Sequence, residues 1–193
     1  MKILKSTGIK NINNIKKRVA IIANSSWYIY NFRDNLISIL DKSNFDVYCI
    51  APIDEYSKKL TKHIHWPLHA TSKNPLIEFL SLIRLIYLLK NNRIDILLSF
   101  TPKGNLYSAI ASFVMKKKII INISGLGENF KSSSLGYYPL ENIFRIFLKK
   151  ADNIFFQNKN DFEYLNYDNH LHSNSCVIPG SGVDLTHYNR NIT

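Results

Sequence analysis

Two polar side chains directly follow an apolar run in the segment "SFTPKGN", where Thr101 and Lys103 are candidates for binding an anionic ligand. A lysine at such a point can approach a phosphate group as a compact positive charge. The alternative is a solvated lysine in the first turn of a helix. Because a cation near a helix N-terminus is slightly unfavourable, the position favours a functional role for Lys103.

A second candidate segment, "NSSWYIYNFR" at residues 24–33, places aromatic side chains between polar ones and ends in Arg33. Its polar members are Asn24, Ser25, Ser26 and Asn31. Exposed aromatic rings beside an arginine suit stacking on a sugar or contact with an isoprenoid chain, whereas buried rings would belong to the core. The pattern leaves both interpretations open.

Glycines mark a third candidate loop, "NISGLGENF", in which Ser124 precedes Gly125 and Gly127. The glycines let backbone N–H groups approach a ligand closely, or they simply serve a turn that needs positive φ. The sequence has no GxGxxG motif, no Walker lysine motif and no GxSxG motif. It therefore does not support a dinucleotide site, a P-loop or a serine nucleophile on a strand-to-helix turn.

Histidines and cysteines offer no metal site. The pairs "HIH" at residues 63–65 and "HLH" at residues 170–172 have no carboxylate or cysteine companion, so we interpret them as surface or core histidines. Cys49 and Cys176 are far apart and form no CxxC motif, which is typical of free thiols in a reducing compartment. The sequence predicts neither a metal nor a cofactor.

Apolar runs alternate with helical patterns from residue 18 onward. Runs such as "RVAIIAN" are apolar throughout, as in parallel strands that are covered on both faces. Asn31 is expected to cap the helix that follows it, and Asn74 to cap a largely apolar helix that begins at Pro75. Strands are expected at 18–24, 46–52, 64–70, 95–100, 118–124, 153–157 and 176–180, with further helices at 54–63, 104–115, about 138–150 and 158–165.

This order of elements predicts an α/β fold with a doubly wound, Rossmann-like parallel sheet of about seven strands and right-handed crossovers. In that architecture ligands bind outside the carboxyl ends of the strands, where the strand order reverses. The loops after the strands, which hold the candidate residues above and Asn158, are therefore expected to form the site.

The 193-residue chain carries a net charge of +11, and its first eighteen residues hold six basic residues and no acidic one. We interpret residues 1–17 as a poorly ordered leader; the alternative is a basic arm for anionic lipid or nucleic acid. The basic residues are scattered and no nucleic-acid recognition motif occurs, so nucleic acid is not expected as a partner.

No stretch reaches the roughly 20 apolar residues that cross a bilayer. The segment at 75–90 comes nearest and spans about 24 Å as a helix. Because it is apolar nearly all round, we expect it to be buried; the alternative is a face against a membrane or an isoprenoid chain. The protein is predicted to be soluble or peripheral.

Seven segments stand in a specific order over about residues 18–189. They are "NSSWYIYNFRDNL", "APIDEYSKKL", "NPLIEFLSLIRLIYLL", "DILLSFTPKGNLYSAIAS", "INISGLGENF", "FFQNKNDFEYL" and "PGSGVDLTHY". In this order they resemble the amino-terminal half of bacterial glycosyltransferase family 4 enzymes. No single motif decides the resemblance, but the ordered set is specific. Glu128 departs from it, because an aromatic or aliphatic residue commonly follows "GLG" there.

The resemblance implies a GT-B architecture and a retaining transfer of a sugar from a nucleotide sugar to a polyprenyl-diphosphate-linked acceptor, in the synthesis of capsule, lipopolysaccharide or a similar polysaccharide. It implies that this half binds the acceptor and associates with the inner face of the cytoplasmic membrane, which is anionic. The catalytic residues stay unassigned. The acceptor-binding residues it suggests are Asn24, Ser25, Ser26, Asn31, Arg33, Thr101, Lys103, Ser124, Gly125, Gly127 and Asn158.

The resemblance also divides the chain. Residues 18–183 correspond to the acceptor-side domain, and residues 184–193 to the start of a linker toward a donor domain that binds the nucleotide sugar. We therefore expect this chain to be inactive alone. The alternative is a non-catalytic, membrane-associated subunit or remnant that needs a separate donor-domain chain as its partner.

Overall fold

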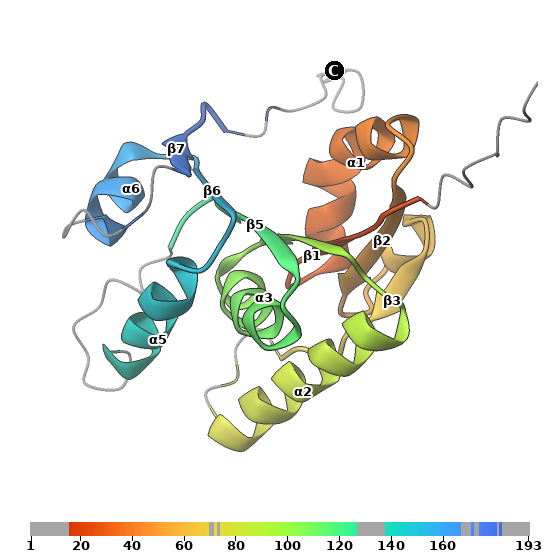
Figure 1. The fold of residues 1–193 in the computed structure, drawn as a ribbon. Helices are drawn as coiled ribbons and strands as arrows, with labels where there is room; N and C mark the ends of the chain where they lie inside the picture. Colours follow the sequence, from red (N-terminus) through yellow and green to blue (C-terminus); the bar gives the residue numbers. More distant parts are fainter. Residues whose placement is uncertain are drawn as a thin grey trace, which may run out of the picture.

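In a computed structural model, residues 16–69, 72, 74–126, 138–166, 171, 174–180 and 182 are described, and their strands form one sheet (Figure 1). All neighbouring strands are parallel, in the order β3-β2-β1-β4-β5-β6-β7. The predicted seven-stranded parallel sheet is confirmed. Its strands are β1 (Arg18–Ile22), β2 (Asp46–Ala51), β3 (His63–His65), β4 (Ile96–Phe100), β5 (Lys118–Ile123), β6 (Asn153–Phe156) and β7 (Ser175–Val177).

The helices cover the two faces of the sheet unequally. α1 (Ser26–Lys42) lies on one face, over β1 and β2, whereas α2 (Pro75–Asn91), α3 (Pro102–Met115) and α5 (Tyr138–Leu148) lie on the other (Figure 1). α6 (Lys159–Leu165) lies beside β6 and β7 at the end of the sheet. From β1 the chain winds outward to β2 and β3, and from β4 it winds the opposite way. The strand order therefore reverses between β1 and β4.

The start of α1 differs from the prediction, because Ser25 and not Asn31 caps it. Ser25 has extended backbone angles and its Oγ accepts a hydrogen bond of 3.2 Å from the Tyr28 N–H. Asn31 instead lies in the second turn, where its Nδ2 donates to the Trp27 carbonyl at 2.8 Å. The earlier start gives α1 a buried face at three- to four-residue spacing, with Ser26, Ile29, Arg33 and Ile37.

Two further expectations are wrong in extent. The helix expected at 54–63 is reduced to a 3-10 turn, η1 (Ser57–Lys59). The third strand is the "HIH" segment itself, and it ends before Trp66 and Pro67, because proline cannot donate to the ladder. The Asn74 cap is confirmed, since its side chain accepts a 3.0 Å hydrogen bond from the Leu76 N–H.

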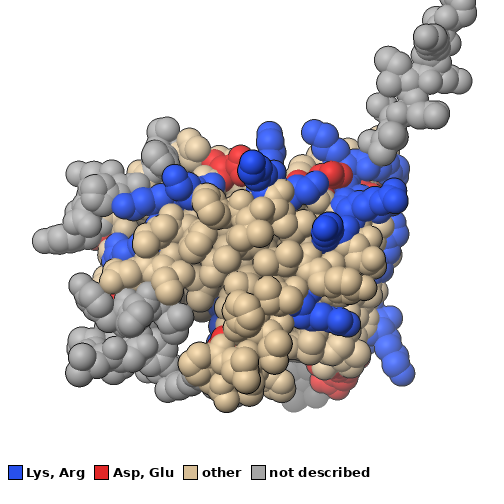
Figure 2. All heavy atoms as spheres, turned by 60° about the horizontal axis from the view of Figure 1, so that its bottom comes forward, with Lys and Arg blue, Asp and Glu red and all other residues tan. Residues whose placement is uncertain are grey.

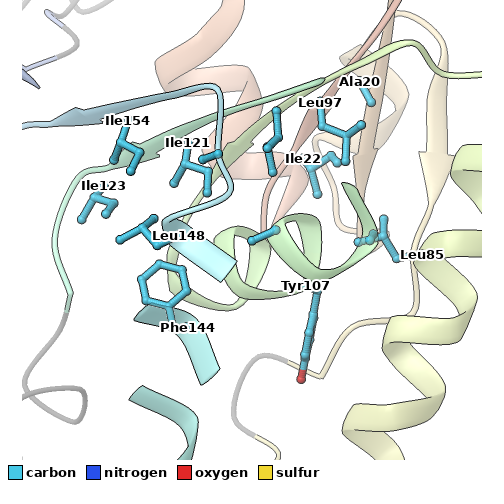
Figure 3. Close-up of a cluster of buried hydrophobic side chains, with 14 of the residues drawn as sticks. Ala20, Ile22, Leu85, Leu97, Tyr107, Ile121, Ile123, Phe144, Leu148 and Ile154 are labelled. Carbon is cyan, nitrogen blue, oxygen red and sulfur yellow. The ribbon is translucent and has the colours of Figure 1, made fainter. Parts of the chain in front are cut away.

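The larger core lies between the sheet and α2, α3 and α5. Strand side chains such as Ile22, Leu97 and Ile121 point toward Tyr107 on α3 and Leu85 on α2 (Figure 3). On the opposite face, alternate residues of the same strands, such as Ile21 and Leu98, pack against α1. Both faces of the central strands are apolar for this reason, as the uninterrupted apolar runs predicted.

The expected burial of α2 is wrong for most of its length. Only Ser81, Leu85, Leu88 and Leu89 are buried. The opposite side presents a stripe of large apolar side chains to solvent. They are Leu76, Ile77, Phe79, Leu80, Ile83 and Tyr87. No helix in the described part of the chain combines the length and the apolar character that crossing a bilayer demands.

Candidate functional site

The loops that follow β1 and β4 meet where the strand order reverses. The Asn24 N–H donates to Thr101 Oγ1 at 3.1 Å, and this contact joins two loops 77 residues apart in sequence. Thr101 has φ of 70°, which is costly for a β-branched residue and is the kind of local strain that clusters at functional sites. Two of the predicted site residues are thus brought together at the reversal point.

Gly104 allows the first turn of α3 to approach this point closely. A Cβ at Gly104 would lie 3.0 Å from Thr101 Oγ1 and 3.5 Å from the Ile22 carbonyl oxygen. A larger residue would therefore require the Thr101 side chain to shift by a few tenths of an ångström. The reversal point is a tightly built junction of β1, β4 and α3.

Ser26 is fully buried and its hydroxyl is used inside the protein. Its Oγ donates to the Pro52 carbonyl at 2.8 Å and accepts from Ser57 Oγ at 3.0 Å. The contact with His63 Nε2 is 3.0 Å, and when the Ser26 hydroxyl donates to Pro52, His63 Nε2 is the donor in this contact. Burial lowers the pKa of His63, which keeps this ring neutral. Ser26 therefore fastens the loop after β2 to α1.

Arg33 is buried against aromatic rings. Its guanidinium carbon lies 4.1 Å from the centre of the Phe100 ring and 5.1 Å from that of Tyr28. It also donates to the Tyr28 hydroxyl, and to the Phe32 carbonyl at 3.3 Å. Burial lowers the pKa of Arg33 from its usual value, because a charge loses hydration there. The aromatic contacts offset part of that loss.

Arg33 also forms part of the wall of a pocket of about 580 Å³. The pocket lies between α1 and strands β4, β5 and β6, on the face of the sheet opposite α3 and α5. Its lining is mostly apolar and includes Leu36, Phe100 and Phe155. An anionic group placed in it would meet the Arg33 charge in a surrounding that screens poorly.

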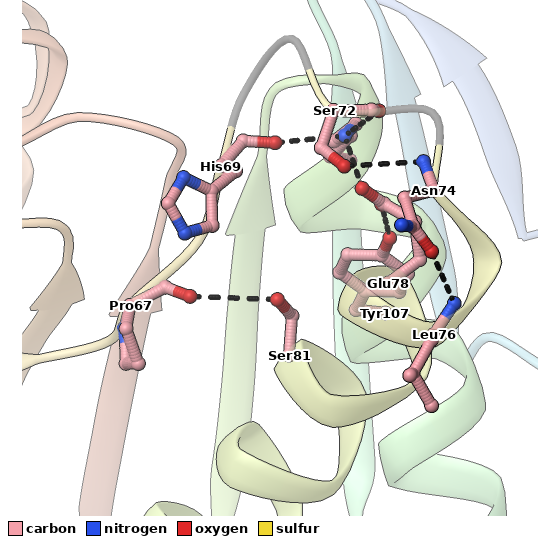
Figure 4. Close-up of polar contacts among 9 residues, drawn as sticks. Pro67, His69, Ser72, Asn74, Leu76, Glu78, Ser81 and Tyr107 are labelled. Atoms are coloured by element: carbon pink, nitrogen blue, oxygen red, sulfur yellow. Dashed lines mark hydrogen bonds and ion pairs between the residues drawn. The ribbon is translucent and has the colours of Figure 1, made fainter.

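Lys103 uses its three donors within the protein, between α3 and the loop that leads into α2 (Figure 4). Its Nζ donates to the His69 carbonyl at 2.8 Å, to the Ser72 carbonyl at 2.7 Å and to Glu78 Oε1 at 2.9 Å. The other Glu78 oxygen accepts from the Tyr107 hydroxyl. A lysine has three N–H donors, so binding a phosphate would require this network to open.

The remaining predicted residues lie at the ends of β5 and β6. Asn158 caps α6, and the Asp161 carboxylate accepts from Asn158 Nδ2 at 2.8 Å and from the Leu126 N–H at 3.1 Å. This buried carboxylate thereby holds the loop that contains Ser124 and Gly125. A Cβ at Gly125 would meet nothing within 4 Å, so there is open space on that side of the residue.

Several sequence predictions lie outside the described residues. These are the role of Gly127, the departure at Glu128, the leader before Lys16, and the linker at residues 184–193. Of the second histidine pair only Leu171, between the two histidines, is described. The first pair lies on β3, where His65 Nδ1 accepts from the Ile53 N–H while His63 contacts Ser26.

The exposed stripe of α2 fits the alternative interpretation of residues 75–90 as an exposed face, and it belongs to a wider exposed apolar surface that we call the apolar helix face. It consists of the exposed stripe of α2 and of Phe113, Val114, Ile143 and Ile146 on α3 and α5. Figure 2 shows a broad area without charged side chains, with lysines and arginines along its border. Lys16, Lys17, Lys116, Lys117 and Lys118 gather at the amino edge of the sheet. Exposed apolar surfaces bordered by polar residues are typical of interaction sites.

Known proteins share this chain's sequence pattern. A family model described as glycosyl transferase 4-like matches residues 18–158. The N,N'-diacetylbacillosaminyl-diphospho-undecaprenol alpha-1,3-N-acetylgalactosaminyltransferase of Campylobacter jejuni is 26% identical over 178 residues, which cover 87% of this chain and 47% of that protein. The chain therefore spans about half the length of the curated relative it matches.

Solved structures share the fold. A UDP-N-acetylglucosamine 2-epimerase superposes with a TM-score of 0.62 at 16% identity, over 84% of this chain and 48% of that one. A glycosyltransferase from Rickettsia africae superposes with a TM-score of 0.57 at 18% identity, over 93% of this chain and 47% of that one. At such identities the likeness shows the Rossmann-like fold alone, and the partial coverage fits the amino-terminal half of a GT-B protein.

Proposed function

The chain belongs to the glycosyl transferase 4-like family, and on this premise we propose that it forms the acceptor-binding part of a glycosyltransferase. Its acceptor is a sugar linked through diphosphate to a polyprenyl lipid, and the reaction takes place at a membrane surface. The name of the Campylobacter jejuni relative describes transfer to a diphospho-undecaprenol-linked sugar, which supports this choice of acceptor class.

The observation that carries the proposal is the apolar stripe at the start of α2. Leu76, Phe79 and Leu80 are 66%, 58% and 57% exposed, in a helix whose first turn is fixed by the Asn74 cap. α2 runs antiparallel to the strands, so its start lies at the carboxyl ends of the strands, where the reversal point is. A lipid-linked acceptor needs both an apolar contact for its chain and a polar site for its head.

Charge supports an anionic membrane as the partner of the apolar helix face. The lysines at the amino edge and Lys90 at the end of α2 border this face, and each basic residue near an anionic surface contributes about 1 kcal/mol. We accordingly propose that the protein acts on the inner, cytoplasmic face of the membrane. The positive border and the apolar centre are together proposed to hold the apolar helix face against the lipid head groups.

The acceptor head is proposed to bind among the loops after β1, β4 and β5. Asn24, Thr101 and Gly125 border this region, and Asn31 lies one turn into α1 beside it. Ser25, Ser26 and Asn158 act by positioning these loops. In a retaining transfer, negative charge builds up on the leaving diphosphate of the nucleotide sugar. Hydrogen-bond donors and cationic side chains stabilise this charge.

The nucleotide sugar is proposed to bind to residues outside this chain, on a donor domain or a partner chain. Holding two reactants together can lower a barrier by about 7–11 kcal/mol, and one wall of a two-sided site cannot supply that. The chain alone is therefore expected to give no transfer of radiolabelled sugar to lipid-linked acceptors. Turnover without added protein would contradict this part of the proposal.

The proposal is tested by sedimentation with vesicles of phosphatidylglycerol and of phosphatidylcholine, at low and high salt. We expect stronger binding to the anionic vesicles, weakened by salt. Burying an exposed Leu or Phe contributes about 1–2 kcal/mol, so replacing Leu76, Phe79 and Leu80 together by serine should weaken binding on the order of a hundredfold or more.

The matched control is Ile39→Ser, which changes a 60% exposed apolar residue of α1 on the other face of the sheet. It should leave vesicle binding unchanged. Equal binding of wild type and the triple variant would contradict the proposed role of the apolar helix face. Membrane binding without any preference for lipid-linked sugars would favour the non-catalytic membrane-associated subunit instead.

A further inference from the structure

Trp27 is a large aromatic side chain left accessible beside the reversal point. It lies in the first turn of α1, three residues after Asn24, and 46% of it is exposed. Of the two tryptophans in the sequence, Trp66 is fully buried and donates its indole N–H to the Ser81 carbonyl at 2.9 Å. The neighbouring Tyr28 faces inward to Arg33 and Phe100. Of Trp27, Trp66 and Tyr28, Trp27 is the one whose side chain is exposed to solvent.

The backbone of Trp27 is fixed and its indole ring packs against another ring. The indole meets the Phe32 ring edge to face, with ring centres 5.5 Å apart and planes at 80°. The backbone N–H of Trp27 donates to Asp54 Oδ2 at 2.8 Å, and its backbone carbonyl accepts from Asn31 Nδ2 at 2.8 Å. A residue supported along its backbone and at one ring edge loses less freedom when a ligand stacks on the ring.

Hydrogen bonds extend this support into the core. Asp54 accepts from the Tyr56 N–H and donates its own N–H to Ser57 Oγ, at 2.9 Å and 2.8 Å. Ser57 contacts Ser26, which in turn is bound by His63 on β3. The "HIH" segment thereby fastens the loop that carries Asp54 against the first turn of α1.

We propose that Trp27 is the platform on which the first sugar ring of the acceptor stacks, and that Asp54 and the serine–histidine chain behind it position this platform. The inference rests on the proposed function and identifies the residue that distinguishes a sugar-bearing lipid diphosphate from a bare one. The C–H bonds on one face of a pyranose are apolar and slightly positive, and they match the negative face of an indole. Trp27 acts as a specificity-determining residue.

The test measures binding of two soluble probes to the 193-residue chain, N-acetylglucosaminyl-diphospho-farnesol and farnesyl diphosphate. Trp27→Ser should lower affinity for the sugar-bearing probe roughly tenfold, and leave affinity for farnesyl diphosphate within about twofold. Trp27→Phe, which keeps an aromatic face, should restore most of the loss. In a Trp66→Phe background, the emission of Trp27 should shift only with the sugar-bearing probe.

The outcomes separate this inference from the proposed function. If wild type binds neither probe, the proposed function fails and the platform with it. If wild type binds the sugar-bearing probe and Trp27→Ser binds it equally well, only the platform is wrong. Equal losses for both probes would assign Trp27 to the lipid or the diphosphate and would also overturn the platform. Thermal unfolding of each variant checks that the fold is intact.

Discussion

Replacing Lys103 by methionine should destabilise the protein more than it affects ligand binding. Methionine keeps an unbranched apolar side chain but removes all three donors, to His69, Ser72 and Glu78. Charge-assisted hydrogen bonds contribute about 1.5–3 kcal/mol each when buried. Here the Lys103 and Glu78 side chains are 25% and 21% exposed, so water replaces part of what is lost.

The net loss expected from this geometry is about 2 kcal/mol of unfolding free energy, since the two carbonyls can turn to water while Glu78 keeps only Tyr107. For a chain of this length that corresponds to a fall of about 4–8 °C in the thermal midpoint. Adding Glu78→Gln to Lys103→Met should recover part of the loss, because no carboxylate is then left without its cation.

Thermal unfolding followed by circular dichroism is the assay, with Lys159→Met as the matched control. Lys159 pairs with Glu163 at 3.4 Å on the surface, where the two side chains are 80% and 59% exposed, and its loss should cost less than about 0.5 kcal/mol. An unchanged midpoint for Lys103→Met, together with a loss of lipid-diphosphate binding, would refute this reasoning. It would restore the phosphate contact expected from the sequence alone.

Three other predictions follow from Lys116 and Cys49. Lys116 ends α3 in the left-handed region with φ of 53°, so Lys116→Gly should raise the unfolding free energy by about 1 kcal/mol in urea titrations. Burial raises the pKa of the Cys49 thiol from 9.0 to about 12, so iodoacetamide should modify the exposed Cys176 alone in the folded protein. Because the unfolded thiol ionises first, Cys49 should also make the unfolding free energy fall as pH rises from 9.0 toward about 12.

The sheet was predictable because its signal is local. Each central strand is buried on both faces, so it reads as an uninterrupted apolar run wherever it occurs. The start of α1 was not predictable in this way, because Ser25 and Asn31 are both good capping residues within one segment. The choice between them depends on which start buries Ile29 and Ile37 against the sheet, a tertiary contact that the segment does not contain.

The roles of the site residues were harder to predict for the same reason. The hydrogen-bond partners of Lys103 lie 25 to 34 residues away in sequence, in the first turn of α2 and in the loop before it. The aromatic segment combines an exposed ring, Trp27, with an Arg33 that is enclosed by rings. Its sequence pattern therefore fitted both the ligand-contact and the core interpretation. In α2 an apolar residue occupies nearly every position, so no periodicity distinguishes the buried side from the exposed one.

The central claim is that this chain recognises a polyprenyl-diphosphate-linked sugar at a membrane surface. The most direct measurement is its affinity for phosphatidylglycerol vesicles that contain a small fraction of undecaprenyl-diphospho-N-acetylglucosamine, compared with vesicles that contain undecaprenyl diphosphate instead. The two vesicles carry the same lipid chain and diphosphate, so only the sugar differs. The account predicts roughly tenfold tighter binding to the sugar-bearing vesicles. Equal affinity for both would contradict it.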